Sequence, residues 1–186
     1  MTTPLAERIR PKKLEDYISQ THLVGETGIL TQNIKRGIIP SMIFWGPPGT
    51  GKTTLAEIIA QESERPFYTL SAINAGVKDV REVIEKAKGK NGLFTPRNPI
   101  LFIDEIHRFS KSQQDSLLAA VERGWITLIG ATTENPSFEV ISPLLSRCQV
   151  YVLKSLEKND LNKLINNALP VLEEDCGKKI ILQEKE

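Results

Sequence analysis

A glycine-rich stretch at residues 46–53, GPPGTGKT, has the residue types and spacing that bind phosphate groups. It matches the pattern G-x-x-x-x-G-K-[ST] at every fixed position and lies between a short apolar run and a helical pattern. Glycines let the backbone curl until successive N–H groups point at a polyphosphate, and the start of a helix adds the positive end of its dipole. These flanks favour a nucleotide site over a chance glycine-rich turn. The residues expected to contact the nucleotide in this stretch are Gly46, Pro47, Pro48, Gly49, Thr50, Gly51, Lys52, Thr53 and Thr54.

Two pairs of side chains are candidates for the chemistry at those phosphates. Lys52 would reach the β- and γ-phosphates as a point charge, and the Thr53 hydroxyl would bind Mg²⁺. Asp104 and Glu105 directly follow the apolar run at residues 100–103, ILFI, which is typical of a buried parallel strand. Ligands bind at the carboxyl ends of such strands, so Asp104 can hold the same Mg²⁺ and Glu105 can deprotonate an attacking water. A solvated acidic turn is the structural alternative for this pair.

Two later positions add weaker signals. Thr132 and Thr133 follow a second buried-type strand and could hydrogen-bond the water or the γ-phosphate, although threonine at a strand end is also ordinary turn chemistry. Arg147 lies at the end of a helix predicted to begin at Ser142-Pro143. It is either a helix-terminal cation facing the dipole or an arginine finger that completes the site of a neighbouring subunit. The periodicity of the sequence does not distinguish these two roles of Arg147.

Strand and helix patterns alternate along the chain, which predicts an α/β fold with a parallel sheet and helices on both faces. We predict that Ser112-x-x-Asp115 is a capping box, and that Ser142 is an N-cap followed by Pro143 at the first helical position. Residues 1–25 are expected to form an extended arm with one helical turn near residues 14–18. The predicted strands are 42–45, 66–70, 100–103, 126–129 and 149–153. The other predicted helices are 28–36, one starting near Thr53, 77–88, and one carrying Leu161, Leu164, Ile165 and Ala168.

The charge balance excludes a global attraction to nucleic acid. Lys and Arg number 24 and Asp and Glu number 23, so the net charge is +1 and any such contact must come from a local patch. The local basic residues are interspersed with acidic ones, which suits either a solvated helix face or contact with phosphate backbones. These basic residues are Lys78, Arg81, Lys86, Lys88, Lys90 and Lys111.

Other single residues carry little functional signal. Cys148 and Cys176 lack metal-ligand spacing, which indicates free, packed thiols in a reducing compartment. His107 is interpreted as a packing or hydrogen-bonding residue rather than a ligand. No apolar run approaches the roughly 18 residues that span a bilayer, and the N-terminus has no apolar core, so we expect a soluble protein that is not secreted.

Taken together, the motifs resemble those of AAA+ ATPases: GPPGTGKT, LFIDEIH, GATTENPSF and LLSRC occur in the order found in that family. From about Pro4 to Leu156 the chain more closely resembles the family of the replication-associated recombination ATPases, which includes the eukaryotic Werner-helicase-interacting ATPase. GATTENPSF is the most specific piece. The resemblance implies a P-loop AAA+ core with a five-stranded parallel sheet over residues 1–154, and the beginning of a helical lid over residues 155–186.

The resemblance also implies roles for particular residues. Thr133 is expected to be the first sensor, with Asn135 as the second choice, and Arg147 a finger that acts in a neighbouring subunit. Residues 75–81, AGVKDVR, correspond to a region that faces DNA in related clamp loaders. By the same resemblance, Lys52 and Thr53 form Walker A, Asp104 and Glu105 form Walker B, and Arg10, Pro11, Tyr17 and Ile18 surround the adenine and ribose of ATP.

The function implied by the resemblance is a DNA-dependent ATPase in replication-fork maintenance, recombination and repair. Its expected partners are single-strand gaps, forks or DNA ends, single-strand-binding protein and further copies of itself, in the cytoplasm at the nucleoid and away from membranes. The chain ends inside the expected lid, before a second sensor arginine and an assembly region, so we expect a fragment with weak turnover. A clamp-loader-like, ATP-gated scaffold and a branch-migration motor remain as alternatives. Glu105 counts against the scaffold, and residues 134–138 count against the motor.

Overall fold

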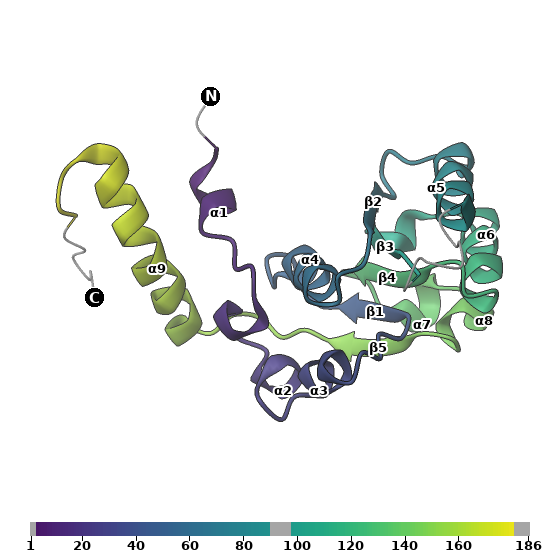
Figure 1. The fold of residues 1–186 in the computed structure, drawn as a ribbon, viewed down its shortest axis with the longest axis horizontal. Coiled ribbons are helices and arrows are strands. Elements are labelled where there is room, and N and C mark those ends of the chain that lie inside the picture. The colour runs from purple at the N-terminus through teal and green to yellow at the C-terminus, as the bar shows by residue number, and fades with distance from the viewer. Residues whose placement is uncertain (1–2, 90–97, 181–186) are drawn as a thin grey trace.

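One parallel sheet organises the computed structural model, which describes residues 3–89 and 98–180. Its five strands lie in the order β2-β3-β4-β1-β5, and all neighbours are parallel (Figure 1). This confirms the predicted five-stranded parallel sheet. The strands are β1 (Met42–Trp45), β2 (Phe67–Ser71), β3 (Ile100–Asp104), β4 (Thr127–Thr132) and β5 (Gln149–Val152). Lys90 and residues 181–186 of the expected lid lie outside the described residues.

Helices connect the strands and cover the sheet. Four short elements, α1, α2, α7 and η2, were not expected from the sequence, because three or four residues are too few to show a helical period. The short helices are α1 (Leu5–Arg8), η1 (Leu14–Asp16), α2 (Thr21–Val24), η2 (Ile106–Arg108), α7 (Pro136–Glu139) and α8 (Ser142–Leu145). The longer ones are α3 (Ile29–Lys35), α4 (Lys52–Glu62), α5 (Val77–Gly89), α6 (Lys111–Glu122) and α9 (Lys158–Cys176).

Side chains of the central strands alternate between two separate cores. Met42 and Phe44 point to one face and pack with α4, η1, α2 and α3, whereas Ile43 points to the other and packs with α5, α6, η2 and α8. The same alternation sends Phe102 and Leu101 of β3 to opposite faces. Helices therefore cover both faces, as predicted, and Figure 1 shows α4 and α5 on opposite sides of the sheet. Burial on both faces explains why these strands read as continuous apolar runs.

Both predicted helix caps are wrong in position. The capping box of α6 is formed by Ser110 and Gln113: the Ser110 hydroxyl accepts from the Gln113 N–H, and the Gln113 side chain accepts from the Ser110 N–H. The predicted Ser112 lies inside the helix. In α8, Ser142 is the first helical residue and Ile141 occupies the cap position without a side-chain bond. Several S-x-x-polar patterns overlap here, and which serine caps depends on where the chain leaves the sheet.

Helix α9 stands apart from the sheet, on the side of the molecule where α1 also lies (Figure 1). None of its residues is buried, and Leu161 and Ile165 are exposed. An ion pair between Arg8 of α1 and Asp175 of α9 links the two helices. Cys148 packs against the second core, but Cys176, at the end of α9, is exposed, so its predicted packing role is wrong. Among the described residues, no helix is long and apolar enough to cross a bilayer.

Candidate active site

The predicted site residues converge because of strand order. Strands β3, β4 and β1 are neighbours and parallel, so the segments that follow them leave the sheet at the same edge. Asp104 ends β3, Thr132 ends β4 opposite Trp45 of β1, and the glycine-rich loop follows Trp45 directly. The acidic pair, the threonine pair and the loop therefore share one edge of the sheet. These residues are far apart in the sequence, and the order and direction of the strands bring them together.

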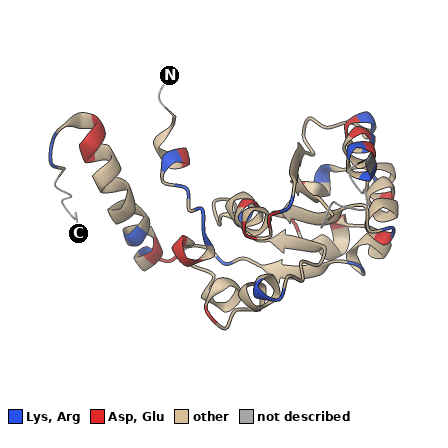
Figure 2. Ribbon diagram, in the orientation of Figure 1, with Lys and Arg blue, Asp and Glu red and all other residues tan. Residues whose placement is uncertain are grey.

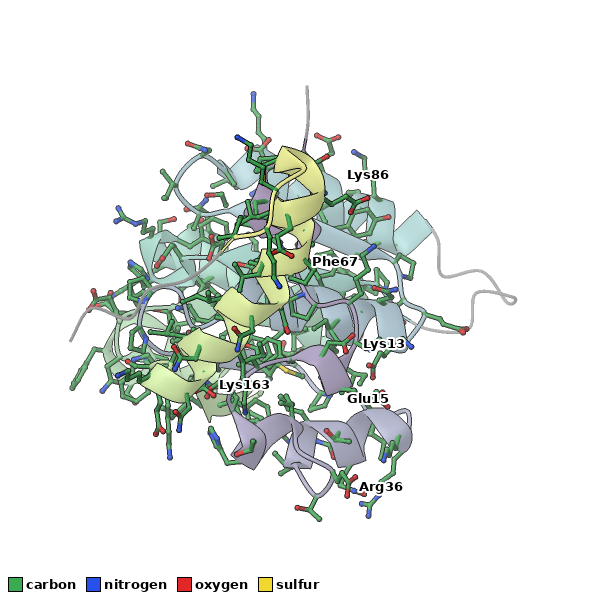
Figure 3. The ribbon with its side chains drawn as sticks, turned by 90° about the vertical axis from the view of Figure 1, so that its left-hand side faces the viewer. Lys13, Glu15, Arg36, Phe67, Lys86 and Lys163 are labelled. Atoms are coloured by element: carbon green, nitrogen blue, oxygen red, sulfur yellow. The ribbon has the colours of Figure 1, made fainter. Side chains whose placement is uncertain are left out.

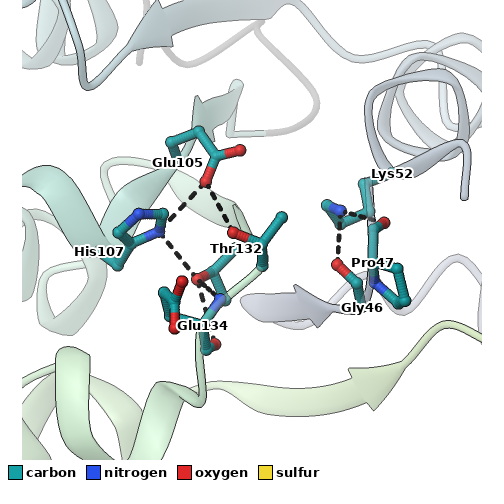
Figure 4. A network of polar contacts seen from close by, with 8 residues as sticks. Gly46, Pro47, Lys52, Glu105, His107, Thr132 and Glu134 are labelled. Atoms are coloured by element: carbon teal, nitrogen blue, oxygen red, sulfur yellow. Dashed lines mark hydrogen bonds and ion pairs between the residues drawn. The ribbon is translucent and has the colours of Figure 1, made fainter. Parts of the chain in front are cut away.

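Lys52 is folded onto the glycine-rich loop. Its Nζ donates to the Gly46 carbonyl at 2.8 Å and to the Pro47 carbonyl at 2.9 Å, and the residue is 8% exposed (Figure 4). Burial lowers the pKa of the Lys52 ammonium, while the charges of Glu105 and Asp104 raise it. Those two carboxylates thus act electrostatically on Lys52. A cation whose hydrogen bonds in the described structure go to loop carbonyls is suited to exchange these contacts for those of an anion.

Tyr17 contacts the same glycine-rich loop. Its hydroxyl donates to the Thr50 carbonyl at 2.9 Å, and the residue is buried. Burial raises the pKa of the Tyr17 hydroxyl, which therefore remains a donor. Gly49 and Gly51 have φ of +76° and +85°, a region that favours glycine. A Cβ at Gly51 would lie 2.6 Å from the Tyr17 oxygen, whereas a Cβ at Gly49 would meet nothing within 4 Å.

Glu105 has an unusual backbone and a well-defined environment. Its φ of 54° and ψ of 48° are left-handed, which costs a non-glycine residue about 1–2 kcal/mol. Its Oε2 lies 3.2 Å from His107 Nδ1, and Thr133 Oγ1 donates to the same oxygen at 3.5 Å. A strained residue held among polar partners at a sheet edge is typical of a functional site. These contacts agree with the interpretation of His107 as a hydrogen-bonding residue, although the sequence did not indicate Glu105 as its partner.

The threonine pair divides into two roles. Thr132 is fully buried, and its hydroxyl donates to the Glu134 carbonyl at 3.2 Å and accepts from the Glu134 N–H at 3.0 Å. Thr133 reaches Glu105 instead. Asn135 is the N-cap of α7, where its side chain accepts from the Ser137 N–H at 3.0 Å. The structure therefore brings Thr133, and not Thr132, to the acid.

A hollow of about 120 Å³ opens beside the loop, lined mainly by apolar groups. Three of the four predicted adenine residues line it, but Arg10 does not. The Arg10 guanidinium pairs with Glu7 at 2.9 Å and with Glu57 of α4 at 3.0 Å. Two leucines that sequence reasoning missed, Leu156 before α9 and Leu164 within it, add a wall to the hollow. The hollow is lined by Pro11, Tyr17, Ile18, Gly49, Thr50, Gly51, Thr54, Leu156 and Leu164.

Arg147 lies at the opposite edge of the sheet from Lys52. It precedes β5, whose first residue, Gln149, is level with Met42 at the start of β1. The glycine-rich loop begins after the other end of β1. The length of that strand, about 13 Å, therefore separates the loop from the end of the sheet where Arg147 lies. The Arg147 guanidinium donates to the Pro143 carbonyl at 2.7 Å and pairs with Glu122 at 2.6 Å, and it is 41% exposed. It is therefore not part of the Lys52 site of its own chain.

The candidate DNA-facing helix α5 carries mixed charge. Lys86 pairs with Glu82 at 2.6 Å and Lys88 pairs with Glu85. Lys88 Nζ also lies 4.1 Å from the centre of the Trp125 ring. Lys, Arg, Asp and Glu alternate along this helix in Figure 2. Internal pairing of this kind is typical of a solvated face.

Comparison with known proteins agrees with this geometry. The model of the ATPase family associated with various cellular activities (AAA) matches residues 42–156, more than half of the chain. The chain belongs to the AAA family of ATPases. The matched residues include the glycine-rich loop and the acidic pair.

Individual relatives of this AAA chain carry related names. It is 53% identical, over 96% of its length, to Replication-associated recombination protein A of Coxiella burnetii, and 48% identical, over 97%, to ATPase WRNIP1 of Dictyostelium discoideum. It covers 40% and 20% of those proteins. The resemblance predicted from the motifs is thereby confirmed.

A solved structure confirms the fold. The Thermotoga maritima RuvB Holliday junction branch migration motor is 31% identical, with a TM-score of 0.72 over 89% of this chain and 55% of the motor.

Proposed function

We propose that this chain is the ATP-binding and ATP-hydrolysing module of a DNA-dependent ATPase that acts in replication-fork maintenance, recombination and repair. The observation that carries the proposal is the placing of Lys52, Glu105 and Thr133 at one sheet edge, with the Glu105 charge acting on Lys52. The name of the 53% identical relative supports recombination as the context.

The residues at this edge fit ATP and Mg²⁺. Lys52 would exchange the Gly46 and Pro47 carbonyls for phosphate oxygens, and the backbone of residues 46–53 would cradle the phosphates. The Thr53 hydroxyl and the Asp104 carboxylate are hard oxygen donors of the kind Mg²⁺ prefers, and Mg²⁺ commonly uses only one or two carboxylates beside phosphate. Bound there, Mg²⁺ would neutralise charge on the β- and γ-phosphates.

Glu105 is proposed as the general base and Thr133 as the sensor. The Glu105 carboxylate would take a proton from the attacking water, and Thr133 would donate to that carboxylate or to the γ-phosphate. Asn135 is less suited to sensing because its side chain caps α7. Arg10 is the least supported contact, since its guanidinium is paired with Glu57.

The adenine is proposed to enter the apolar hollow between the N-terminal arm and α9, against Pro11, Tyr17 and Ile18, with Leu156 and Leu164 on the lid side. In that arrangement residues 1–154 form the core and residues 155–186 begin the lid. Nucleotide would then contact both units, which the Arg8–Asp175 ion pair also joins.

Arg147 is proposed to act in a neighbouring subunit. Its exposed place at the far sheet edge suits a residue that serves the site of another copy in an oligomer. The pair with Glu122 would keep the guanidinium extended until the neighbour docks.

DNA is proposed as the partner, contacted through its phosphates at single-strand gaps, forks or ends, with single-strand-binding protein nearby in the cytoplasm. Lys78 and Arg81 near the start of α5 are the proposed contacts, since Lys86 and Lys88 are paired internally. Identity of 53% to a recombination protein, against 31% to the branch-migration motor, favours the recombination role.

The test is the ATPase rate of the longest form that the gene encodes, with and without gapped or forked DNA. We expect stimulation by DNA, loss of ATP binding in Lys52→Ala, and retained binding with turnover reduced about 10²–10⁴-fold in Glu105→Gln. Normal hydrolysis by Glu105→Gln would refute the base assignment. Rates that ignore DNA would favour an ATP-gated scaffold.

A further inference from the structure

His107 lies within hydrogen-bonding distance of two oxygens. Its Nδ1 is 3.2 Å from Glu105 Oε2 and 3.0 Å from Thr132 Oγ1 (Figure 4). The side chains of His107 and Glu105 are 13% and 25% exposed, so little solvent competes for these contacts. The imidazole therefore bridges the end of β4 and the residue after β3 on the proposed catalytic edge.

Glu105 and Thr132 together indicate which ring nitrogen of His107 carries a proton. A threonine hydroxyl has a single proton to donate. With that proton donated to the Glu134 carbonyl at 3.2 Å, the Thr132 hydroxyl accepts from His107 at 3.0 Å. The Glu105 carboxylate is also only an acceptor. Both neighbours of Nδ1 are acceptors, and Nδ1 therefore bears the proton whether the ring is neutral or charged.

The two donors to Glu105 meet at one of its oxygens. His107 Nδ1 and Thr133 Oγ1 both contact Oε2. Among residues 3–89 and 98–180 no hydrogen bond engages Oε1. A carboxylate fixed by one oxygen has a defined plane, and its second oxygen is presented in a single direction.

We infer that His107 is a positioning residue: its Nδ1–H, oriented by Thr132, holds Glu105 Oε2 so that Oε1 faces the attacking water. The inference rests on the proposed function, because it needs Glu105 to be the base. The expected tautomer of His107 does not depend on the proposed function, because it follows from hydrogen bonding alone. A purely structural histidine would support folding without affecting the orientation of Glu105.

Kinetics separate positioning from folding. His107→Asn keeps an N–H donor near the position of Nδ1, whereas His107→Leu keeps side-chain bulk without a donor. In the longest form of the protein we expect His107→Leu to lower kcat about 10- to 100-fold, the loss expected for one hydrogen bond to a charged group, with KM for ATP nearly unchanged. His107→Asn should recover most of that loss. Equal kcat values for the two variants, or a kcat raised by His107→Leu, would overturn the inference.

A spectroscopic test does not depend on activity. The chain has two histidines, and His22 offers an internal contrast because its Nε2 lies 3.1 Å from the Val152 carbonyl. Long-range ¹H–¹⁵N spectra at a pH where the rings are neutral should show an Nδ1–H tautomer for His107 and an Nε2–H tautomer for His22. His22→Gln assigns the signals. Thr132→Ser, which retains the hydroxyl, should preserve the His107 tautomer.

The kinetic and spectroscopic tests distinguish a failure of the inference from a failure of the proposed function. An Nε2–H tautomer with a bare Nδ1 at His107 overturns the inference whatever the ATPase rate. A wild-type protein that does not hydrolyse ATP refutes the proposed function, and the spectra then still decide the hydrogen bonding of His107.

Discussion

At the scale of single residues, the loop depends on contacts that its own sequence does not contain. Tyr17 lies 33 positions before Thr50, yet its hydroxyl holds the Thr50 carbonyl. Gly51 is therefore needed twice, once for its positive φ and once because the Tyr17 oxygen occupies the space of a side chain. Gly49 meets only the first requirement. Comparing substitutions at Gly49 and Gly51 therefore separates the effect of backbone strain from the effect of crowding.

We predict that Gly51→Ala destabilises the protein more than Gly49→Ala. Both substitutions strain a left-handed backbone, but only Gly51→Ala crowds the Tyr17 oxygen. This crowding adds about 1–3 kcal/mol to the loss in free energy of unfolding. Urea unfolding without nucleotide measures the difference. Tyr17→Phe in the Gly51→Ala background should recover part of the added loss, since it removes the nearest atom. Equal midpoints for the two alanine variants would contradict the prediction.

At the scale of elements, helix starts depend on where the chain leaves the strand before them. Helix α6 begins after η2 and Phe109, which is buried, and this places Ser110 rather than Ser112 at the cap. The Gln113 side chain also donates to the Ala75 carbonyl at 3.0 Å, so the cap of α6 holds the segment before α5. One capping box thus links two helices of the second core.

We predict that Ser110→Ala lowers the free energy of unfolding by about 1 kcal/mol, the usual value of an N-cap. Ser112→Ala, at an exposed position inside the helix, should change it by less than about 0.5 kcal/mol. Thermal or urea unfolding of the two variants side by side gives the comparison. A larger effect at Ser112 would restore the cap predicted from the sequence.

At the scale of the whole molecule, the hollow beside the loop has one wall that stands apart from the sheet. Helix α9 contributes Leu164 to the hollow but buries none of its own residues in the described structure. In Figure 3 the helix faces the viewer, with Lys163 on it. Arg147 lies at the sheet edge away from the loop. Enclosure of a nucleotide by α9 and by a neighbouring copy is therefore part of the proposed function.

We predict that Arg147→Ala lowers the ATPase rate of the assembled, longest form by about 10³-fold or more while ATP binding persists. Glu105→Gln subunits keep an intact Arg147, so mixing them with Arg147→Ala subunits should restore part of the rate. Arg123→Ala, which removes an exposed cation at the end of α6, is the control and should have little effect. No recovery in mixed assemblies would leave Arg147 as a helix-terminal cation paired with Glu122.

The sequence by itself determined the five-stranded parallel sheet and the convergence of the loop with the acidic pair. Both follow from local signals, since apolar runs mark buried strands and parallel strands place their carboxyl ends together. It could not show that Thr133 rather than Thr132 reaches Glu105, or that His107 bridges the two strands.

Tertiary structure alone decided the pairing of Arg10 with Glu57, the leucine wall of the hollow and the place of Arg147. These are contacts between segments far apart in the chain. Their geometry depends on how whole elements pack, and residue types and spacing carry no signal for it.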